Sequence, residues 1–377
     1  MIPLCEPLIE GNEWKYIKDC LDTNWVSSVG GYVDLFEEKF KRYVQSKAAV
    51  VAMNGTSAIT LALQVLGVGQ GNEVIVPSMT FAASVNPIKY VGAEPVFIDI
   101  TPDTWVMDVE KVEELITPRT RAFLPVHIYG NVVDMEPLLK LAEKYNLYII
   151  EDATEALGSE YRTSDGVWHK VGTMGHFGAF SFNGNKLITT GAGGMLVTNN
   201  VVYGNKAKHL SNQAKIGLDN GGMYHEEVGY NYRMPNILAA MGAAQMEKID
   251  DYLSKKIQHA KLYDKLLMDV GGVQLPCQKE NVKHSQWMYS VLINSEYEIN
   301  RDNLIKKLKD NGIMSRPFFS AIHQMKPYKE SKAGEMETTN KVVEKGINLP
   351  SSVGLKEEEV EYICSLIRRD YKNGKSI

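Results

Sequence analysis

The chain has 377 residues, of which 44% are hydrophobic and 23% are charged. This composition is typical of a globular protein and excludes a disordered or fibrous one. The 41 basic and 46 acidic residues give a net charge of -5, without the basic excess of a nucleic-acid-binding protein. At this length a single hydrophobic core stops growing, so we expect a large domain and a smaller one.

The cysteines and the first residues bear on where the protein works. The cysteines lie far apart without a C-x-x-C pair, so we expect reduced thiols rather than a disulfide framework or a zinc site. The start MIPLCEPLIEGNEW has no basic segment followed by an apolar one, and no run approaches the roughly 18 apolar residues of a membrane helix. We therefore expect a cytoplasmic protein with no membrane partner. The cysteines are Cys5, Cys20, Cys277 and Cys364.

Seven short runs of apolar and β-branched residues predict strands. Segments of helical length and spacing lie between most of them, as at 57–66 and 135–145, so we expect βαβ units, a mostly parallel sheet and an α/β fold. The last two runs are separated by 183–194, which is too short for a crossover helix; either one strand is antiparallel or this connection is a functional loop. The predicted strands are 48–53, 73–77, 94–100, 121–130, 147–152, 178–182 and 193–198.

After Pro235 the sequence predicts one long helix over 236–267, which we expect to link two domains. Beyond it, the apolar run QWMYSVLI and the helical patterns RDNLIKKLKDNG and LKEEEVEYICSLIRRDY predict a small α+β unit. We therefore divide the chain into a large domain of residues 1–245 and a small C-terminal domain of residues 246–377.

The residues Asn54 to Ser57 stand between a predicted strand and a predicted helix. Free backbone N–H groups and the positive end of the helix dipole make such a junction a binding site for an anion. Plain capping of the helix by Thr56 or Ser57 explains these residues better when they are taken alone.

Two aspartates end apolar strands. Asp152 follows LYIIE at the carboxyl end of its strand, the edge at which ligands bind in α/β sheets. A carboxylate buried there is costly unless a cationic group pairs with it, although capping of a helix is an alternative role. Asp99 ends EPVFIDI in a similar way, and for this residue we favour the cap.

The loop NGNK places Lys186 among glycines between two apolar strands. A flexible backbone lets an amine approach a bound group closely, and such a lysine can form a Schiff base; a solvent-exposed loop lysine is the alternative. The glycines at 67–71 and 191–194 lack the strand-to-helix context of a dinucleotide fingerprint, which disfavours an oxidoreductase. The histidines show no metal-ligand spacing, so we expect no metal.

An anion site, a strand-end aspartate and a loop lysine in this order match the needs of pyridoxal phosphate. The phosphate needs the helix terminus, the protonated pyridine nitrogen needs Asp152, and the aldehyde needs Lys186. Each feature alone has a structural explanation. Their combination predicts this cofactor.

Motifs along nearly the whole chain resemble those of the DegT/DnrJ/EryC1/StrS family of sugar aminotransferases. In chain order they are NWVSSVGGYVDLFEEKF, NGTSAITLAL, VPSMTFAASVNPIKYVGAEPVFIDI, VHIYGNVVDM, EDATEALGS, GAFSFNGNKLITTGAGG, GYNYRMPN and SRPFFSAIHQMKPY. The resemblance implies the fold type I aminotransferase architecture, with a large and a small domain. It also implies pyridoxal phosphate and a homodimer with active sites at the interface.

Residues that match the family's motifs have roles implied by the resemblance. Lys186 resembles the Schiff-base lysine, Asp152 the partner of the pyridine nitrogen, and Phe81 the aromatic ring that stacks on the cofactor. Asn231 resembles a residue that reaches the phosphate of the other subunit. The residues that resemble phosphate ligands are Thr56, Ser57 and Ser181.

Substrate contacts are implied at both ends of the chain. Arg316 and His323 are similar in position to residues that contact substrate in the family. The pyrophosphate of a nucleotide sugar needs cations or N–H groups, and Arg316 and the segment 25–28, which includes Ser27, offer them. The base needs an apolar or aromatic wall, for which Trp25 is a candidate.

Two positions compare this chain with different members of the family. Many relatives have glutamine in place of Glu155, near the hydroxyl of the cofactor, which gives Glu155 a different hydrogen-bond or proton role. Related sugar dehydratases have histidine in place of the lysine. Because Lys186 is present, the resemblance implies transamination, with L-glutamate as the amino donor.

The resemblance also points to an amino acceptor. The loop SFNGNK is similar to that of enzymes that aminate C4 of 4-keto-6-deoxy nucleotide sugars, and WVSSVGGYVDLFE resembles the subgroup acting on UDP-linked N-acetylated sugars. We expect UDP-2-acetamido-4-keto-6-deoxy-hexose; the alternatives are GDP-4-keto-6-deoxymannose, as in perosamine-forming relatives, and a 3-keto sugar. A non-catalytic protein that senses a ligand through the same lysine is a competing hypothesis, which a change of absorption on adding glutamate would exclude.

Overall fold

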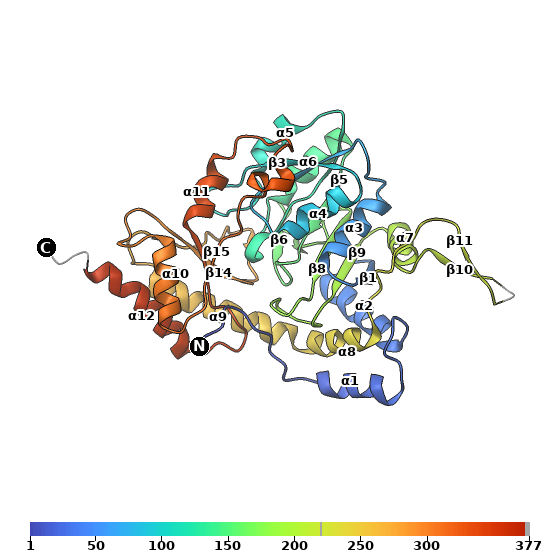
Figure 1. Ribbon diagram of the computed structural model, residues 1–377, viewed down its shortest axis with the longest axis horizontal. Helices are drawn as coiled ribbons and strands as arrows, with labels where there is room; N and C mark the ends of the chain where they lie inside the picture. The colour runs from blue at the N-terminus through green and yellow to red at the C-terminus, as the bar shows by residue number, and fades with distance from the viewer. Residues whose placement is uncertain (219–220, 374–377) are drawn as a thin grey trace.

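The computed structural model describes residues 1–218 and 221–373. Most of the molecule is a seven-stranded sheet covered by helices, and the C-terminal part adds a smaller sheet with its own helices (Figure 1). Among the described residues, no helix is long and apolar enough to cross a membrane. The architecture is the α/β fold that the strand pattern predicts.

All seven predicted strands are present in the large sheet. Their order is β1-β9-β8-β5-β4-β2-β3, and each strand is mostly buried, as expected where helices cover both faces. The strands are β1 (Ala48–Ala52), β2 (Glu73–Pro77), β3 (Glu94–Ile98), β4 (Thr120–Phe123), β5 (Tyr148–Asp152), β8 (Phe177–Ser181) and β9 (Gly194–Thr198).

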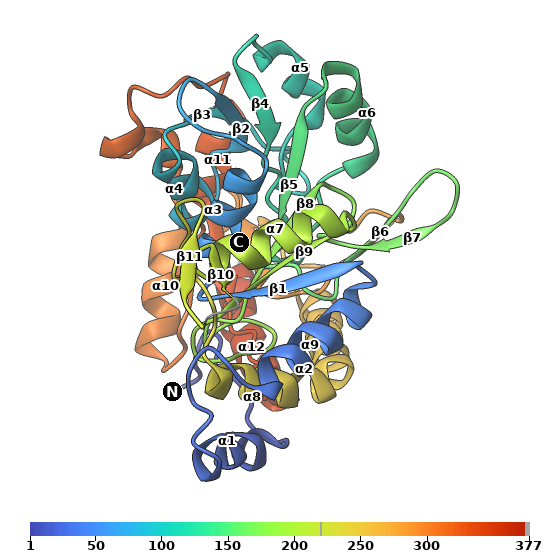
Figure 2. The ribbon, with the colours of Figure 1, turned by 90° about the vertical axis from the view of Figure 1, so that its right-hand side faces the viewer.

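Two layers of helices enclose this sheet. On β8 alternate side chains point to opposite faces: Phe180 and Phe182 pack on Phe40 of α2, whereas Ser181 lies beside Gly55 at the start of α3. Figure 2 shows α2 and α7 on opposite sides of β1. The helices of residues 1–245 are α1 (Glu13–Asp22), α2 (Gly31–Val44), α3 (Gly55–Val65), α4 (Ala82–Tyr90), α5 (Val112–Leu115), α6 (Met135–Tyr145), α7 (Val201–Ser211) and α8 (Asn236–Gln245).

Strand β9 alone runs against the direction of the other six. It pairs antiparallel with both β8 and β1, whereas β8 and β5 are parallel. The short connection 182–193 therefore needs no crossover helix, which confirms the antiparallel alternative. This connection carries Lys186, and it leaves the sheet at the edge where β1, β2, β4 and β5 also end.

The prediction of one helix over 236–267 is wrong. Helix α8 ends at Gln245, a 3-10 turn covers Met246–Lys248, and α9 (Ile249–Leu267) then begins. The two helices have different partners, since α8 packs on α1 and α2, and α9 packs on α12 (Glu357–Asn373). The Gln245 side chain donates to Glu13 at 2.6 Å, which ties the end of α8 to α1. These tertiary contacts divide a segment in which the 3-10 turn itself contains neither glycine nor proline.

The C-terminal residues build a second sheet, of order β12-β14-β16-β15, with a separate apolar core between it and its helices. Its strand β14 covers most of the predicted apolar run, and α10 and α12 cover the two predicted helices. The elements are β12 (Val273–Gln274), β14 (Tyr289–Ile293), β15 (Arg316–Pro317), β16 (Gly346–Leu349), α10 (Arg301–Asp310), α11 (Glu337–Lys345) and α12.

Smaller elements project from this frame. A hairpin of β10 (Lys215–Gly217) and β11 (Met223–His225) extends away from the body of the molecule (Figure 1). A second small sheet joins β6 (Glu160–Arg162) to β7 (Trp168–Lys170) and β13 (Val282–Lys283). Short 3-10 turns complete the described chain: η1 (Val109–Lys111), η2 (Ile128–Gly130), η3 (Met246–Lys248), η4 (Ile322–Gln324) and η5 (Lys326–Tyr328).

Candidate active site

A cavity of about 530 Å³ lies at the carboxyl edge of the large sheet, between that sheet and the C-terminal part. Residues more than 250 positions apart in the sequence meet there. Of the site residues predicted from the sequence, those that line the cavity are Thr56, Phe81, Asp152, Glu155, Ser181, Lys186 and Arg316. Those that do not line it are Trp25, Ser27, Ser57, Asn231 and His323.

The start of helix α3 forms one wall. Asn54, rather than Thr56 or Ser57, is the cap of this helix: its Oδ1 accepts the Ser57 N–H at 2.8 Å and the Ser57 hydroxyl at 2.9 Å. The polar groups of Ser57 are therefore already engaged. The positive end of the helix and the Thr56 hydroxyl remain at the cavity, next to Ser181 on β8, which favours an anion there.

Asp152 ends β5 at the floor of the cavity and is buried. Its Oδ2 accepts the Ser84 hydroxyl at 2.6 Å and its Oδ1 accepts the Thr154 N–H at 3.0 Å. Ser84 also shares a hydrogen bond of 2.8 Å with Thr80. In the described part of the chain Asp152 has no ion pair, so this buried carboxylate can accept a further bond from a cationic ligand.

Lys186 reaches the cavity from the connection between β8 and β9. Its Nζ lies 3.5 Å from Glu155 Oε1 and 3.9 Å from the centre of the Trp287 ring. The Trp287 indole N–H donates to the carbonyl of Asn185, the residue before the lysine, at 2.7 Å. The sequence gives no signal for Trp287, because it sits in an apolar run that predicts a strand of a different sheet.

Glu155 is buried opposite Lys186. Its Oε2 accepts the backbone N–H of Tyr129 at 2.9 Å, and Tyr129 has a left-handed backbone with φ of 55°. Burial raises the pKa of the Glu155 carboxyl, while the charge of Lys186 and the Tyr129 N–H oppose this rise. The cavity thus contains a carboxylate and an amine that share low solvent exposure.

The mouth of the cavity combines a cation with aromatic rings. Arg316 is exposed on β15 and lines the opening. Phe81 is 57% exposed, and its ring lies 5.7 Å from that of Phe319. A charged and planar ligand can therefore contact both kinds of group at the entrance.

The remaining predicted residues lie elsewhere. His323 is bonded through Nδ1 to Ser78 Oγ at 2.7 Å, and burial lowers its pKa. Trp25 is 55% exposed, and the backbone carbonyls of Trp25 and Ser27 are held by Asn236 at 2.7 and 2.6 Å. Asn231 is exposed. These side chains do not complete the cavity of a single chain.

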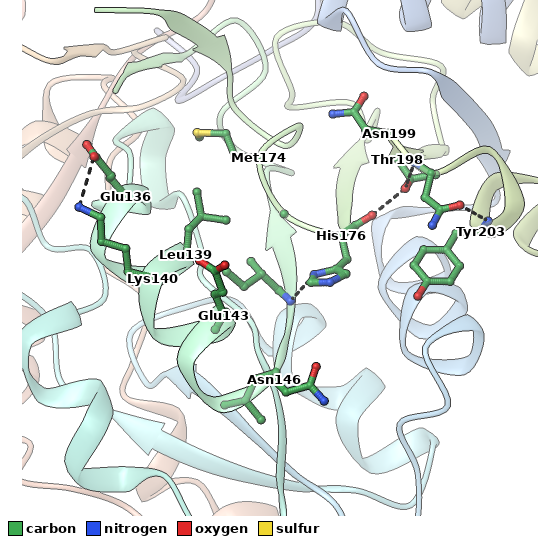
Figure 3. A pocket seen from close by; sticks show the side chains of 15 residues that line it. Glu136, Leu139, Lys140, Glu143, Asn146, Met174, His176, Thr198, Asn199 and Tyr203 are labelled. Carbon is green, nitrogen blue, oxygen red and sulfur yellow. Dashed lines mark hydrogen bonds and ion pairs between the residues drawn. The ribbon is translucent and has the colours of Figure 1, made fainter. Parts of the chain in front are cut away.

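A wider hollow of about 800 Å³ lies at the opposite edge, at the amino ends of β5 and β8. Figure 3 shows that its polar groups bond to one another: Lys140 pairs with Glu136 at 3.4 Å, His176 Nδ1 accepts the Ile149 N–H at 3.1 Å, and Thr198 donates to the His176 carbonyl at 2.7 Å. It is open to solvent, and its amine and acid, Lys140 and Glu136, lie one turn apart on the surface of α6 and pair with each other. The smaller cavity is therefore the candidate active site.

Comparison with known proteins agrees with this assignment. The pattern of the DegT/DnrJ/EryC1/StrS aminotransferase family matches residues 7–368. The chain is 42% identical over 373 residues to GDP-perosamine synthase of Escherichia coli O157:H7, with 99% of each chain covered, and 41% identical over 368 residues to that of Caulobacter vibrioides, with 97% of each covered. The solved PLP form of Spr1654 from Streptococcus pneumoniae, described as a sugar aminotransferase, superimposes with a TM-score of 0.92 at 27% identity over 99% of each chain. The chain belongs to the DegT/DnrJ/EryC1/StrS aminotransferase family.

Proposed function

We propose that this protein is a pyridoxal-phosphate-dependent sugar aminotransferase that moves an amino group from L-glutamate to C4 of GDP-4-keto-6-deoxymannose. The observation that carries the choice of sugar is the similarity, at 41–42% identity over nearly the whole chain, to GDP-perosamine synthases. These relatives support the GDP-linked alternative better than the UDP-linked N-acetylated sugar expected from the opening motif.

The groups in the cavity fit pyridoxal phosphate. The positive end of α3 with the hydroxyls of Thr56 and Ser181 suits a phosphate, and the buried Asp152 carboxylate suits a protonated ring nitrogen. The Lys186 amine is in the same cavity. The volume of the cavity, about 530 Å³, is within the usual range of ligand pockets. When bound, this cofactor supplies an aldehyde carbon and a ring that accepts electrons.

Two residues carry proton chemistry in this proposal. The Lys186 Nζ removes the proton from the α-carbon of glutamate, and in the second half of the reaction it delivers a proton to C4 of the sugar. The Asp152 carboxylate keeps the ring nitrogen protonated, and Ser84 and Thr154 hold it in place. Lys186→Ala is therefore expected to fold and to lose transfer of the amino group; near-normal turnover would contradict the role of Lys186.

The mouth of the cavity suits the nucleotide part of the substrate. Arg316 can bind the pyrophosphate, and the exposed ring of Phe81 with the half-buried ring of Phe319 offers an apolar surface. Trp25 and Ser27, which lie outside the cavity of one chain, remain candidate contacts to the base and the pyrophosphate in an assembled enzyme. His323 is held by Ser78 and is proposed as a further substrate contact.

A homodimer with shared active sites is part of the proposal. Asn231 is exposed, Phe81 lies uncovered at the mouth, and the hairpin of β10 and β11 projects from the body (Figure 1). Asn231 is assigned to the phosphate site of the partner subunit. Mixed dimers of inactive Lys186→Ala and inactive Asn231→Ala chains are then expected to regain activity, because one of the two sites is intact; full activity from a demonstrated monomer would contradict this arrangement.

The experiment that tests the sugar compares three acceptors with glutamate as donor. The value of kcat/KM is measured for GDP-4-keto-6-deoxymannose, UDP-2-acetamido-4-keto-6-deoxy-hexose and a dTDP-linked 3-keto sugar. We expect the GDP sugar to be preferred by a factor of about 10 or more. Preference for the UDP sugar would overturn the choice of nucleotide, and preference for the 3-keto sugar would overturn the choice of carbon.

A further inference from the structure

We propose that Glu155 is the proton partner of Lys186: it takes the proton that the lysine ammonium must lose before its amine can bond to a carbonyl carbon, and returns it when the amine is released. This inference rests on the proposed function, because it requires that Lys186 form and break such a bond. The proposal gives Glu155 the role of proton acceptor when the Lys186 ammonium is deprotonated.

Geometry supports the assignment. The Lys186 Nζ and Glu155 Oε1 are 3.5 Å apart, and the two side chains are 13% and 5% exposed. A movement of roughly half an ångström brings them to hydrogen-bond distance. Because both groups are shielded from water, a proton passes directly between them more readily than to solvent.

The second oxygen of Glu155 is already fixed. Oε2 accepts the Tyr129 N–H at 2.9 Å, so the carboxyl group is oriented and its Oε1 faces the lysine. Tyr129 is itself held, because its hydroxyl accepts the Phe319 N–H at 3.0 Å. Glu155 is therefore a preorganised acceptor rather than a mobile surface acid.

The other charged groups around this pair favour a neutral Glu155 once the lysine has lost its charge. Burial raises the pKa of Glu155, and Asp152, a like charge at the end of β5, raises it further. Arg316, from β15, lines the same cavity at its exposed mouth. The Tyr129 N–H and the ammonium of Lys186 act in the opposite direction, and the second influence disappears when the amine is deprotonated.

Trp287 explains how the ammonium form is held before the transfer. Its ring centre is 3.9 Å from the Lys186 Nζ, a distance at which the face of an indole attracts a cation. The ring does not depend on the lysine for its position, because its N–H bonds to the Asn185 carbonyl and its own carbonyl accepts Lys256 Nζ at 2.9 Å. The amine therefore rests between an acid and an aromatic face.

The step balances without another reactant. An N–H bond of the Lys186 ammonium breaks, an O–H bond forms on Glu155 Oε1, and a charged pair becomes a neutral pair. The reverse transfer restores the carboxylate. No electron is gained or lost, and the site keeps the same net charge.

The test uses the full-length enzyme loaded with pyridoxamine phosphate, in which Lys186 carries no covalent bond. Acetic anhydride labels free amines, and peptide mass spectrometry gives the labelling rate of Lys186 against pH. In Glu155→Gln the negative neighbour is lost, so we expect labelling at pH 7 to be about 10-fold faster than in the native enzyme. Glu155→Asp, which keeps the acid, is expected to restore most of the native rate.

Glu160→Gln is the matched control. Glu160 also pairs with lysines, Lys170 and Lys283, both at 2.7 Å, but it lies outside the cavity. This variant is expected to speed labelling of those two lysines and to leave Lys186 unchanged. Equal Lys186 labelling rates in the native enzyme and in Glu155→Gln would overturn the proposal.

An infrared comparison covers the case in which Glu155→Gln fails to fold. The native enzyme with pyridoxal phosphate is expected to show the carbonyl stretch of a protonated carboxylic acid, which the pyridoxamine phosphate form lacks. Absence of this difference would overturn the proposal. Neither measurement contains a sugar, so failure of the GDP-sugar assignment and failure of this inference are distinguishable.

Discussion

Asp99 and Asp152 both follow buried segments of the large sheet at its carboxyl edge, and both are almost fully buried, yet their surroundings differ. The Asp99 carboxylate accepts the Thr338 N–H at 3.1 Å, the Thr339 N–H and hydroxyl at 2.7 Å each, and the Lys111 ammonium at 3.3 Å. The Asp152 carboxylate accepts bonds from one hydroxyl and one N–H, and it borders the cavity.

The number of hydrogen bonds distinguishes the two residues: the Asp99 carboxylate is structural, whereas the Asp152 carboxylate is available to a ligand. Burial by itself would raise the pKa of Asp99, but hydrogen bonds from Thr339 and from the N–H groups of Ile100 and Thr338 outweigh burial and lower it. The Asp99 carboxylate thus accepts N–H groups in the first turn of α11, a helix more than 230 residues away whose N-cap residue is Met336. Asp99 is structural, as expected, but it does not cap a helix that follows it in its own segment. Asp152 keeps acceptor capacity that the described protein does not fill, as a partner for a cationic ring nitrogen requires.

Asp152→Asn is expected to have the largest effect on activity. The amide keeps the size of the side chain but removes the charge, so we expect kcat/KM to fall on the order of 10³-fold while the free energy of unfolding changes little. Steady-state transamination and urea unfolding of the same preparation measure both quantities. A large loss of stability with intact activity would show that Asp152 is structural instead.

Asp99→Asn is expected to affect stability rather than activity. Loss of charged hydrogen bonds to Thr338 and Thr339 is expected to lower the free energy of unfolding by about 2–3 kcal/mol. Activity at 25 °C is expected to stay within about twofold of the native enzyme, since Asp99 lies outside the cavity. Urea unfolding and kcat/KM check these outcomes, and a major loss of activity in a folded variant would break the distinction between the two aspartates.

The pH dependence of stability tests the same role of Asp99. Because its pKa is lowered on folding, its stabilisation is fully present above the unfolded pKa of about 3.9 and is lost as the pH falls through the folded pKa below that value. The difference in unfolding free energy between the native enzyme and Asp99→Asn should therefore shrink between pH 6 and pH 3. A difference that stays constant over this range would contradict the role of the ionised Asp99 carboxylate.

The smallest effects compare the two hydroxyl donors. Ser84→Ala removes one bond to Asp152, and Thr339→Ala removes one bond to Asp99. Each is expected to cost about 1.5 kcal/mol. For Ser84→Ala we expect this cost in kcat/KM, as roughly a tenfold loss, and for Thr339→Ala in unfolding free energy alone. Equal losses of kcat/KM in both variants would show that Asp152 and Asp99 do not differ in their importance for activity.

Local patterns in the sequence predicted most of the fold. The seven apolar runs became the seven strands, because a strand buried on both faces needs continuous apolar residues and such runs are readable one segment at a time. The short connection 183–194 left two alternatives, an antiparallel strand or a functional loop, and β9 is the antiparallel strand. The helix over 236–267 was misjudged, because the break at Met246–Lys248 comes from the different partners of α8 and α9.

The candidate site was predictable to the extent that its chemistry is local. Asp152, Lys186 and Thr56 were singled out from strand ends and loops, and all three line one cavity. The neighbouring Glu151 lies on the opposite face of the strand from Asp152. Its carboxylate accepts the N–H groups of Gly172 and Met174 at 2.8 and 2.7 Å. The strand-end position selects Asp152, but the donors that occupy Glu151 lie more than 20 residues away and have no local pattern.

The α/β class, the strand segments and the cofactor-binding residue types can be read from the chain alone, because they follow from burial periodicity and from residues close together in the sequence. Three features appear only in the folded molecule: Trp287 joins the cavity, Ser57 bonds to Asn54, and the Asp99 carboxylate accepts more hydrogen bonds than the Asp152 carboxylate. The physical reason is that hydrogen-bond saturation depends on donors brought from distant segments, and such donors leave no periodic trace in the sequence.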